Sequence, residues 1–129
     1  MINYGFTKEL NIPYGKVIEL VRDSLKKEGF GVLTEINVQK IMKEKLGSDM
    51  SKYIILGACS PPNAYKAILT EENIGLMLPC NVIVYEKGGK TVLSFIRPTV
   101  AMQMVDNARL QKVSEEVEGK LKKSFDAIK

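Results

Sequence analysis

The chain has 129 residues, of which 45% are apolar and 26% are charged. This length and composition are typical of one folded domain, so we expect a single domain over residues 1–129 and exclude a disordered chain. The sequence contains no histidine, which excludes Ser-His-Asp and Cys-His catalytic arrangements and removes the commonest metal ligand.

The net charge of +4 comes from 19 basic and 15 acidic residues, and only three of the basic residues are Arg. Nucleic-acid readout favours Arg, whereas scattered Lys is typical of a solvated surface, so we expect no nucleic-acid partner. The longest uncharged stretches, 53–65 and 73–85, contain proline and are too short to cross a bilayer. No signal-peptide pattern is visible, and we expect a cytoplasmic protein with reduced cysteines.

The first half of the chain alternates predicted strands and helices. Residues 3–10 indicate a strand, and a helix is expected from Pro13 to Lys27, ended by Gly29. A second strand is predicted over 31–36. Asn37 then caps a helix that ends at Gly47. We expect the apolar side of this second helix to face the core through Val38, Ile41, Met42 and Leu46.

The second half begins with a strand over 53–59 that is apolar on both faces, as in a covered sheet. A helix is expected over 63–69, after two prolines. Strands are predicted over 80–86 and 91–97, and Pro98 ends this hairpin. Asp106 or Asn107 caps a long last helix. The order predicts an α+β domain with an antiparallel sheet of about five strands and additional inserted helices.

The Gly88-Gly89 pair is the clearest local signal, because two glycines between strand patterns indicate a tight hairpin. Counting outward from this turn pairs Lys87 with Lys90, Val84 with Leu93, Val82 with Phe95, and Cys80 with Arg97. These side chains share one face, which we expect to lie under the helices.

The opposite face of the hairpin is also rich in apolar side chains. It carries Asn81, Ile83, Tyr85, Val92, Ser94 and Ile96. Either an inserted helix or another subunit must cover such a face. We favour a homodimer formed through Ile83, Tyr85, Val92 and Ile96, because twofold pairing is the commonest way to bury such a patch.

The two cysteines are the main candidates for a functional site. If Cys80 lies opposite Arg97, the cation favours the thiolate, and Cys80 is then a reactive thiol. Cys59 lies between a strand and a helix start, where a cysteine pKa is lowered. The alternative for both is a buried cysteine that acts as a small apolar residue.

Other candidates are weaker. Two thiols are too few for a structural zinc site, although a soft ion such as Cu(I) could use Cys59 and Cys80. Glu35 lies in an otherwise apolar strand and is either a half-buried acid or base or a solvent-facing residue. An enzyme would need Cys, Glu35, Lys or Tyr chemistry, and no pair of these lies at diagnostic spacing.

Three stretches together resemble one family, the domain of unknown function 302 (DUF302). They are GFGVLTEINV at 29–38, YIILGACSPP at 53–62 with AYKA at 64–67, and IGLMLPCNVIVYE at 74–86. The resemblance runs across nearly the whole chain. It implies a compact α+β fold related to that of the TATA-binding protein (strand, helix, four strands, helix, with additional helices) and a homodimer, but no established activity and no DNA binding.

The residues that match the family's motifs are Glu35, Gly57, Cys59, Pro61, Pro79, Cys80 and Asn81, while Asn37 stands where the family often has an acidic residue. Combined with the hairpin register, they make Cys59, Cys80, Arg97, Glu35, Pro61 and Asn81 the candidate ligand-binding residues. We expect a small-ligand, soft-metal or redox-sensing role near the cysteines. The alternative is a structural or protein-interaction homodimer with inert cysteines.

Overall fold

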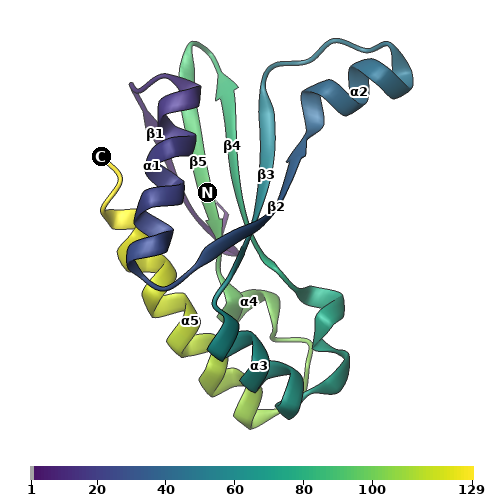
Figure 1. Cartoon of the computed structure of the whole chain (residues 1–129), viewed down its shortest axis with the longest axis vertical. Coiled ribbons are helices and arrows are strands. Elements are labelled where there is room, and N and C mark those ends of the chain that lie inside the picture. The colour runs from purple at the N-terminus through teal and green to yellow at the C-terminus, as the bar shows by residue number, and fades with distance from the viewer. Residues whose placement is uncertain (1) are drawn as a thin grey trace.

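Five strands form one antiparallel sheet in the computed structural model, which describes residues 2–129 (Figure 1). The strand order across the sheet is β1-β5-β4-β3-β2. The predicted α+β domain with a five-stranded antiparallel sheet is therefore confirmed. The strands are β1 (Gly5–Leu10), β2 (Gly31–Asn37), β3 (Tyr53–Cys59), β4 (Cys80–Lys87) and β5 (Lys90–Ile96).

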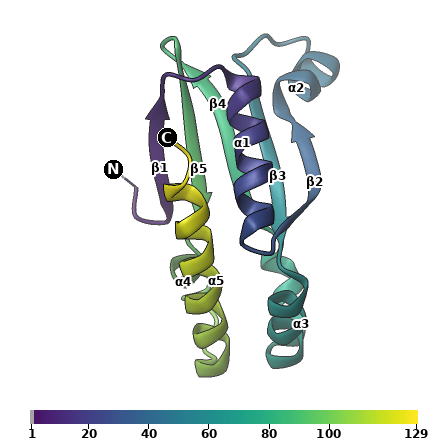
Figure 2. The ribbon, with the colours of Figure 1, turned by 60° about the vertical axis from the view of Figure 1, so that its left-hand side comes forward.

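The helices fall into three groups in space. Helices α1 (Tyr14–Lys27) and α5 (Ala108–Asp126) lie on the same face of the sheet (Figure 2), and α2 (Val38–Leu46) projects from the β2 edge (Figure 1). Beyond the opposite end of the strands, a second lobe contains α3 (Pro61–Thr70), the 3-10 helix η1 (Glu72–Met77), α4 (Pro98–Ala101) and the first half of α5. No helix among the described residues is long and apolar enough to cross a membrane.

The main core lies between the sheet and its two covering helices. Apolar residues of α1 and α5 recur at helical spacing and meet the inward side chains of the strands. The fully buried residues at this interface include Val17, Val21, Leu25, Val82, Val84, Leu93, Phe95 and Leu121. The second lobe has a separate, smaller core made of Ala67, Ile74, Met102 and Leu110.

The predicted hairpin register is confirmed from Lys87–Lys90 to Val82–Phe95. Gly88 and Gly89 have φ values of 59° and 77°, a conformation that favours glycine and matches the twist of the strands. The predicted helix caps are also present. Asn37 Oδ1 accepts a hydrogen bond from Lys40 N at the start of α2. Asn107 Oδ1, rather than a group of Asp106, accepts from Arg109 N and Leu110 N at the start of α5.

The prediction that α2 faces the core is wrong. None of its residues is buried, and Leu46 is 70% exposed. The apolar spacing is that of an amphipathic helix, but α2 leaves the end of β2 and extends away from the sheet (Figure 1). Two smaller differences concern prolines: Pro61 begins α3 two residues earlier than expected, and Pro98 opens α4 as well as ending β5.

The sheet face opposite α1 and α5 has no described helix across its centre (Figure 2). Ile83, Tyr85 and Ile96 are half-buried there, and the Tyr85 ring stacks on that of Tyr53 with centroids 5.2 Å apart. Val92, however, is already buried within the single chain. No described helix covers this face, so the alternative of an inserted helix is wrong.

Candidate functional site

Cys59 and Cys80 are brought close together by the pairing of their strands. Cys59 is the last residue of β3 and Cys80 the first of β4, and the residue before Cys59, Ala58, pairs directly with Cys80. Burial raises the pKa of the Cys80 thiol from 9.0 to about 11, with a smaller contribution from Cys59. Burial also raises the pKa of Cys59. Both thiols are therefore protonated near neutral pH, which favours the buried, apolar alternative over the reactive thiol.

Arg97 does not face Cys80. The strand ends at Ile96, so Arg97 precedes α4 and its backbone donates to Tyr4 O. Its guanidinium donates to Asn3 O at 3.0 Å and to Glu118 Oε2 from Nε and Nη2 at 3.4 and 3.3 Å. The predicted Cys80–Arg97 pair is therefore wrong, because the chain leaves the sheet before the register reaches it. The cation is instead paired with a carboxylate of α5.

Three other sequence candidates have exposed side chains. Glu35 is exposed and accepts a hydrogen bond from Arg22 Nη2 of α1 at 2.8 Å, so its charge is paired at the surface. Asn81 is exposed and pairs with Gly57 of β3. Pro61 is exposed at the first turn of α3, where a missing N–H costs little. None of the three lines the cavity described below.

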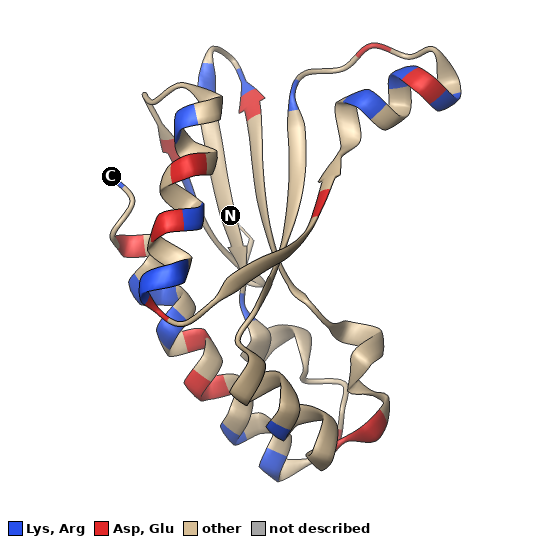
Figure 3. Ribbon diagram, in the orientation of Figure 1, with Lys and Arg blue, Asp and Glu red and all other residues tan. Residues whose placement is uncertain are grey.

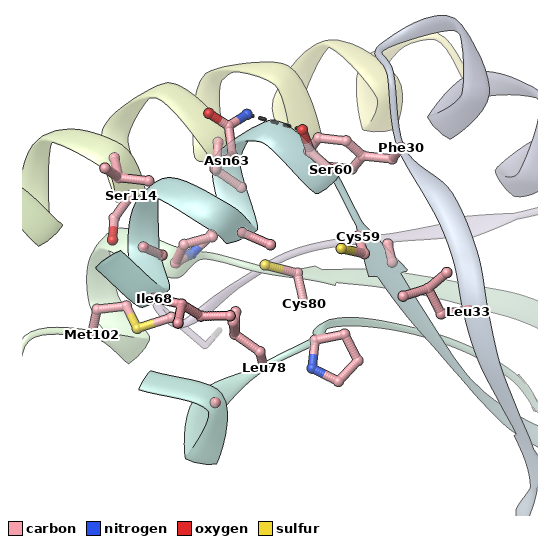
Figure 4. A pocket seen from close by; sticks show the side chains of 18 of the residues that line it. Phe30, Leu33, Cys59, Ser60, Asn63, Ile68, Leu78, Cys80, Met102 and Ser114 are labelled. Carbon is pink, nitrogen blue, oxygen red and sulfur yellow. Dashed lines mark hydrogen bonds between the residues drawn. The ribbon is translucent and has the colours of Figure 1, made fainter. Parts of the chain in front are cut away.

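A cavity of about 350 Å³ lies where the ends of β3 and β4 meet α3 and α5 (Figure 4). Both cysteines line it, and we call it the thiol cavity. Its wall is mainly apolar and contains no Lys, Arg, Asp or Glu. The apolar lining residues are Phe30, Leu33, Ala58, Ala64, Ala67, Ile68, Leu78, Pro79, Pro98, Met102, Leu110, Val113 and Val117.

A small polar cluster interrupts this apolar wall. Ser60 directly follows β3, and Asn63 lies in the first turn of α3; Asn63 Nδ2 donates to Ser60 Oγ at 3.0 Å (Figure 4). Ser114 of α5 also lines the cavity and donates to the carbonyl of Leu110. All three are buried, with exposed fractions of 3% to 8%. Our sequence interpretation missed them, although Ser60 and Asn63 flank the two prolines that mark the helix start.

Gly57 allows the parts of the cavity wall that contain Thr34 and Pro79 to lie close to β3. A Cβ atom at this position would overlap the Thr34 hydroxyl and would lie 2.6 Å from Pro79 Cγ. Thr34 and Pro79 both line the thiol cavity. A glycine in β3 therefore lets β2 and the segment before β4 approach the strand closely.

The arrangement shows no metal centre. Within residues 2–129, no group of three or more His, Cys, Asp or Glu residues is placed to hold a metal ion. Charged residues lie elsewhere: Lys and Arg alternate with Asp and Glu along α1 and α5 (Figure 3). An uncharged, apolar wall with a few hydrogen-bonding groups is the usual lining of a small-molecule site.

Comparison with known proteins identifies the family. The family model described as domain of unknown function DUF302 matches residues 6–128. The chain belongs to the DUF302 family. A solved structure, the uncharacterized conserved DUF302 protein from Bacillus stearothermophilus, is 29% identical, with a TM-score of 0.91 over 98% of each chain. No curated protein matches. The family resemblance of the three sequence stretches is thus confirmed, and the DUF302 fold extends over nearly the whole chain.

Proposed function

We propose that this DUF302 protein binds a small, uncharged and largely apolar molecule in the thiol cavity. The observation that carries the proposal is the cavity itself, whose volume of about 350 Å³ lies within the range of ligand sites. At roughly 30 Å³ for each water-sized group, this space holds about a dozen non-hydrogen atoms. A charged ligand is disfavoured, because no lining side chain carries a compensating charge.

The thiols contribute packing surface rather than chemistry in this proposal. Redox sensing and soft-metal binding through Cys59 and Cys80 both require thiolates. The raised pKa values of the two thiols argue against both roles. The cysteines nevertheless provide a convenient measurement, because both line the cavity and they are the only thiols in the chain.

The test is a titration of the whole protein with neutral indole, naphthalene and naphthol, and with anionic naphthoate, followed by backbone amide NMR shifts. We expect the neutral compounds to shift amides around the cavity and to slow alkylation of Cys80, and naphthoate to do neither. A neutral panel that leaves the lining amides unchanged would overturn the proposal.

Two alanine variants localise the binding. Ala64 lines the cavity from α3, so Ala64→Leu fills part of the space and weakens binding. Ala108 is exposed at the start of α5 and outside the cavity, so Ala108→Leu adds the same atoms with no effect on binding. Equal weakening by both variants would show that the compounds bind elsewhere.

A second candidate function is assembly into a homodimer through the uncovered sheet face. It is supported by the half-buried apolar side chains of Ile55, Ile83, Tyr85 and Ile96, which no described helix covers. We expect sedimentation to give a dimer, and Ile83→Lys to give a monomer. Leu69→Lys, on the exposed surface of α3 and outside the thiol cavity, is the matched control and leaves the dimer intact. A wild-type monomer at high concentration would refute this candidate.

A further inference from the structure

The polar cluster of the thiol cavity has hydrogen-bonding capacity that the chain itself does not use. Asn63 is only 3% exposed, and its Nδ2 donates to Ser60 Oγ. Within residues 2–129, no group donates a hydrogen bond to Asn63 Oδ1, and Ser60 donates its own hydroxyl hydrogen to no protein acceptor. The cluster therefore offers one free acceptor, Asn63 Oδ1, and one free donor, the Ser60 hydroxyl.

Such free groups are uncommon in a protein interior. Buried side-chain oxygen and nitrogen atoms nearly always have partners, because an unpaired polar group in apolar surroundings is costly. Among the described residues, no completely enclosed side-chain atom of this kind lacks a partner. Asn63 Oδ1 is thus reachable by a water-sized molecule, although its residue lines an otherwise apolar cavity. A polar atom in this position is available to a ligand.

Apart from Thr34, Ser114 and the two thiols, the remaining wall is apolar, which limits the ligand groups that can use the pair. Ile68, Leu78 and Met102 line the cavity and offer no side-chain hydrogen bond beyond the weak acceptor of Met (Figure 4). A carbonyl or ether oxygen can only accept, and would leave Asn63 Oδ1 unpaired. A hydroxyl both donates and accepts, so it can donate to Asn63 Oδ1 and accept from Ser60 Oγ. It also carries no charge, as the cavity requires.

We propose that the ligand of the thiol cavity is a small hydroxylated hydrocarbon, an alcohol or phenol, whose hydroxyl is held by Asn63 and Ser60. This inference rests on the proposed function and deepens it. The hydrocarbon part occupies the apolar space, and the hydroxyl determines its orientation. A ligand without the hydroxyl keeps the apolar contacts but leaves Asn63 Oδ1 and the Ser60 hydroxyl unpaired. The free-energy cost of these unpaired groups lets the site discriminate between otherwise similar ligands.

The test compares three probes of nearly one size: naphthalene, naphthol and methoxynaphthalene. Two net hydrogen bonds predict that naphthol binds about tenfold more tightly than naphthalene. Methoxynaphthalene, which cannot donate, loses this advantage. Asn63→Leu keeps the number and branching of the side-chain heavy atoms and removes the acceptor, so we expect naphthol and naphthalene to bind it with similar affinity. Ser60→Ala removes the free donor, together with the acceptor of Asn63 Nδ2, and keeps Asn63 Oδ1, so we expect a smaller naphthol preference. It is the deciding variant if Asn63→Leu does not fold.

The matched control is Thr70→Val, which removes another hydroxyl of α3 that bonds Lys66 O and does not line the cavity. It leaves the naphthol preference unchanged. Equal binding of naphthol and naphthalene by the wild type would overturn the hydroxyl inference while the proposed function stands. A preference that persists in both Ser60→Ala and Asn63→Leu would overturn the residue assignment. Absence of binding by all three probes would overturn the proposed function together with the inference.

Discussion

Arg97 and Glu118 form the ion pair that joins the end of β5 to the middle of α5, with Arg97 Nη2 3.3 Å from Glu118 Oε2. The second carboxylate oxygen, Oε1, accepts from Thr99 N at 3.1 Å and from Thr99 Oγ1 at 2.6 Å. Glu118 is thus the common acceptor for the segment that leads from the sheet into α4. Because Pro98 and Val117 both line the thiol cavity, this network connects the sheet to the cavity wall.

We predict that Glu118→Gln lowers the free energy of unfolding by about 1–3 kcal/mol. The substitution removes the negative charge of the carboxylate, which strengthens the hydrogen bonds that Glu118 accepts. Glu116→Gln is the matched control on the same helix. Its exposed carboxylate lies 3.8 Å from Lys66 and 3.9 Å from Lys120, and such surface pairs contribute about 0–1 kcal/mol. Urea denaturation of the two variants measures the difference. Equal losses would contradict the special role of Glu118.

Cys80 is predicted to be a slow nucleophile. With its pKa raised from 9.0 to about 11, its thiolate fraction near neutral pH falls about a hundredfold, and alkylation slows accordingly. Mass spectrometry of the native protein against pH gives the rate for each cysteine. Arg97→Ala is expected to leave the Cys80 profile unchanged, since Arg97 pairs with Glu118. A rate midpoint below 9 would refute the buried, protonated state.

The same pKa shift makes stability depend on pH. In the unfolded chain Cys80 ionises near 9.0, whereas in the folded protein it ionises near 11. The stabilisation is fully present below about pH 9 and is lost as the pH rises towards about 11, for a total of about 2–3 kcal/mol. Denaturation of the wild type and Cys80→Ala across this range measures it. The difference between the two proteins should narrow as the pH rises, and a constant difference would contradict the prediction.

Two glycines are expected to respond to alanine in opposite directions. Gly57→Ala places a methyl group against Thr34 and Pro79 and should destabilise the protein by about 1–3 kcal/mol. Gly119 lies within α5 with open space around its would-be Cβ, so Gly119→Ala should stabilise by up to about 1 kcal/mol. Thermal and urea denaturation check both. Destabilisation by Gly119→Ala would contradict the prediction, because it would mean that other atoms fill the space next to Gly119.

Asn107 is predicted to stabilise the second lobe in addition to capping α5. Its Nδ2 donates to Thr70 O and Glu71 Oε1, so one side chain joins the end of α3 to the start of α5. We expect Asn107→Ala to cost about 1–2 kcal/mol and to speed amide hydrogen exchange in α3. Asn37→Ala removes a cap that serves α2 only, and it should leave α3 exchange unchanged. Similar exchange in both variants would contradict the joining role.

Local signals in the sequence determined most of the fold. The Gly88-Gly89 turn specified the hairpin register, because a tight turn sets which residues face one another and the strand period of two then assigns each face. Asn37 and Asn107 marked helix starts for an equally local reason, since a side-chain oxygen bonds backbone donors two or three residues later. Pro13 and Gly29 likewise indicated where the first helix begins and ends, and α1 spans Tyr14–Lys27.

What depends on distant segments was decided only by the tertiary structure. The spacing of apolar residues in α2 is the same whether the helix packs on a sheet or projects from it. The exposure of α2 could therefore not be predicted from the sequence. Arg97 has its partner 21 residues away on α5, and its pairing with Glu118 removed the expected cation from Cys80. The thiol cavity requires β3, β4, α3 and α5 to meet, so Ser60 and Asn63 acquired their position only through packing between segments that no local pattern relates.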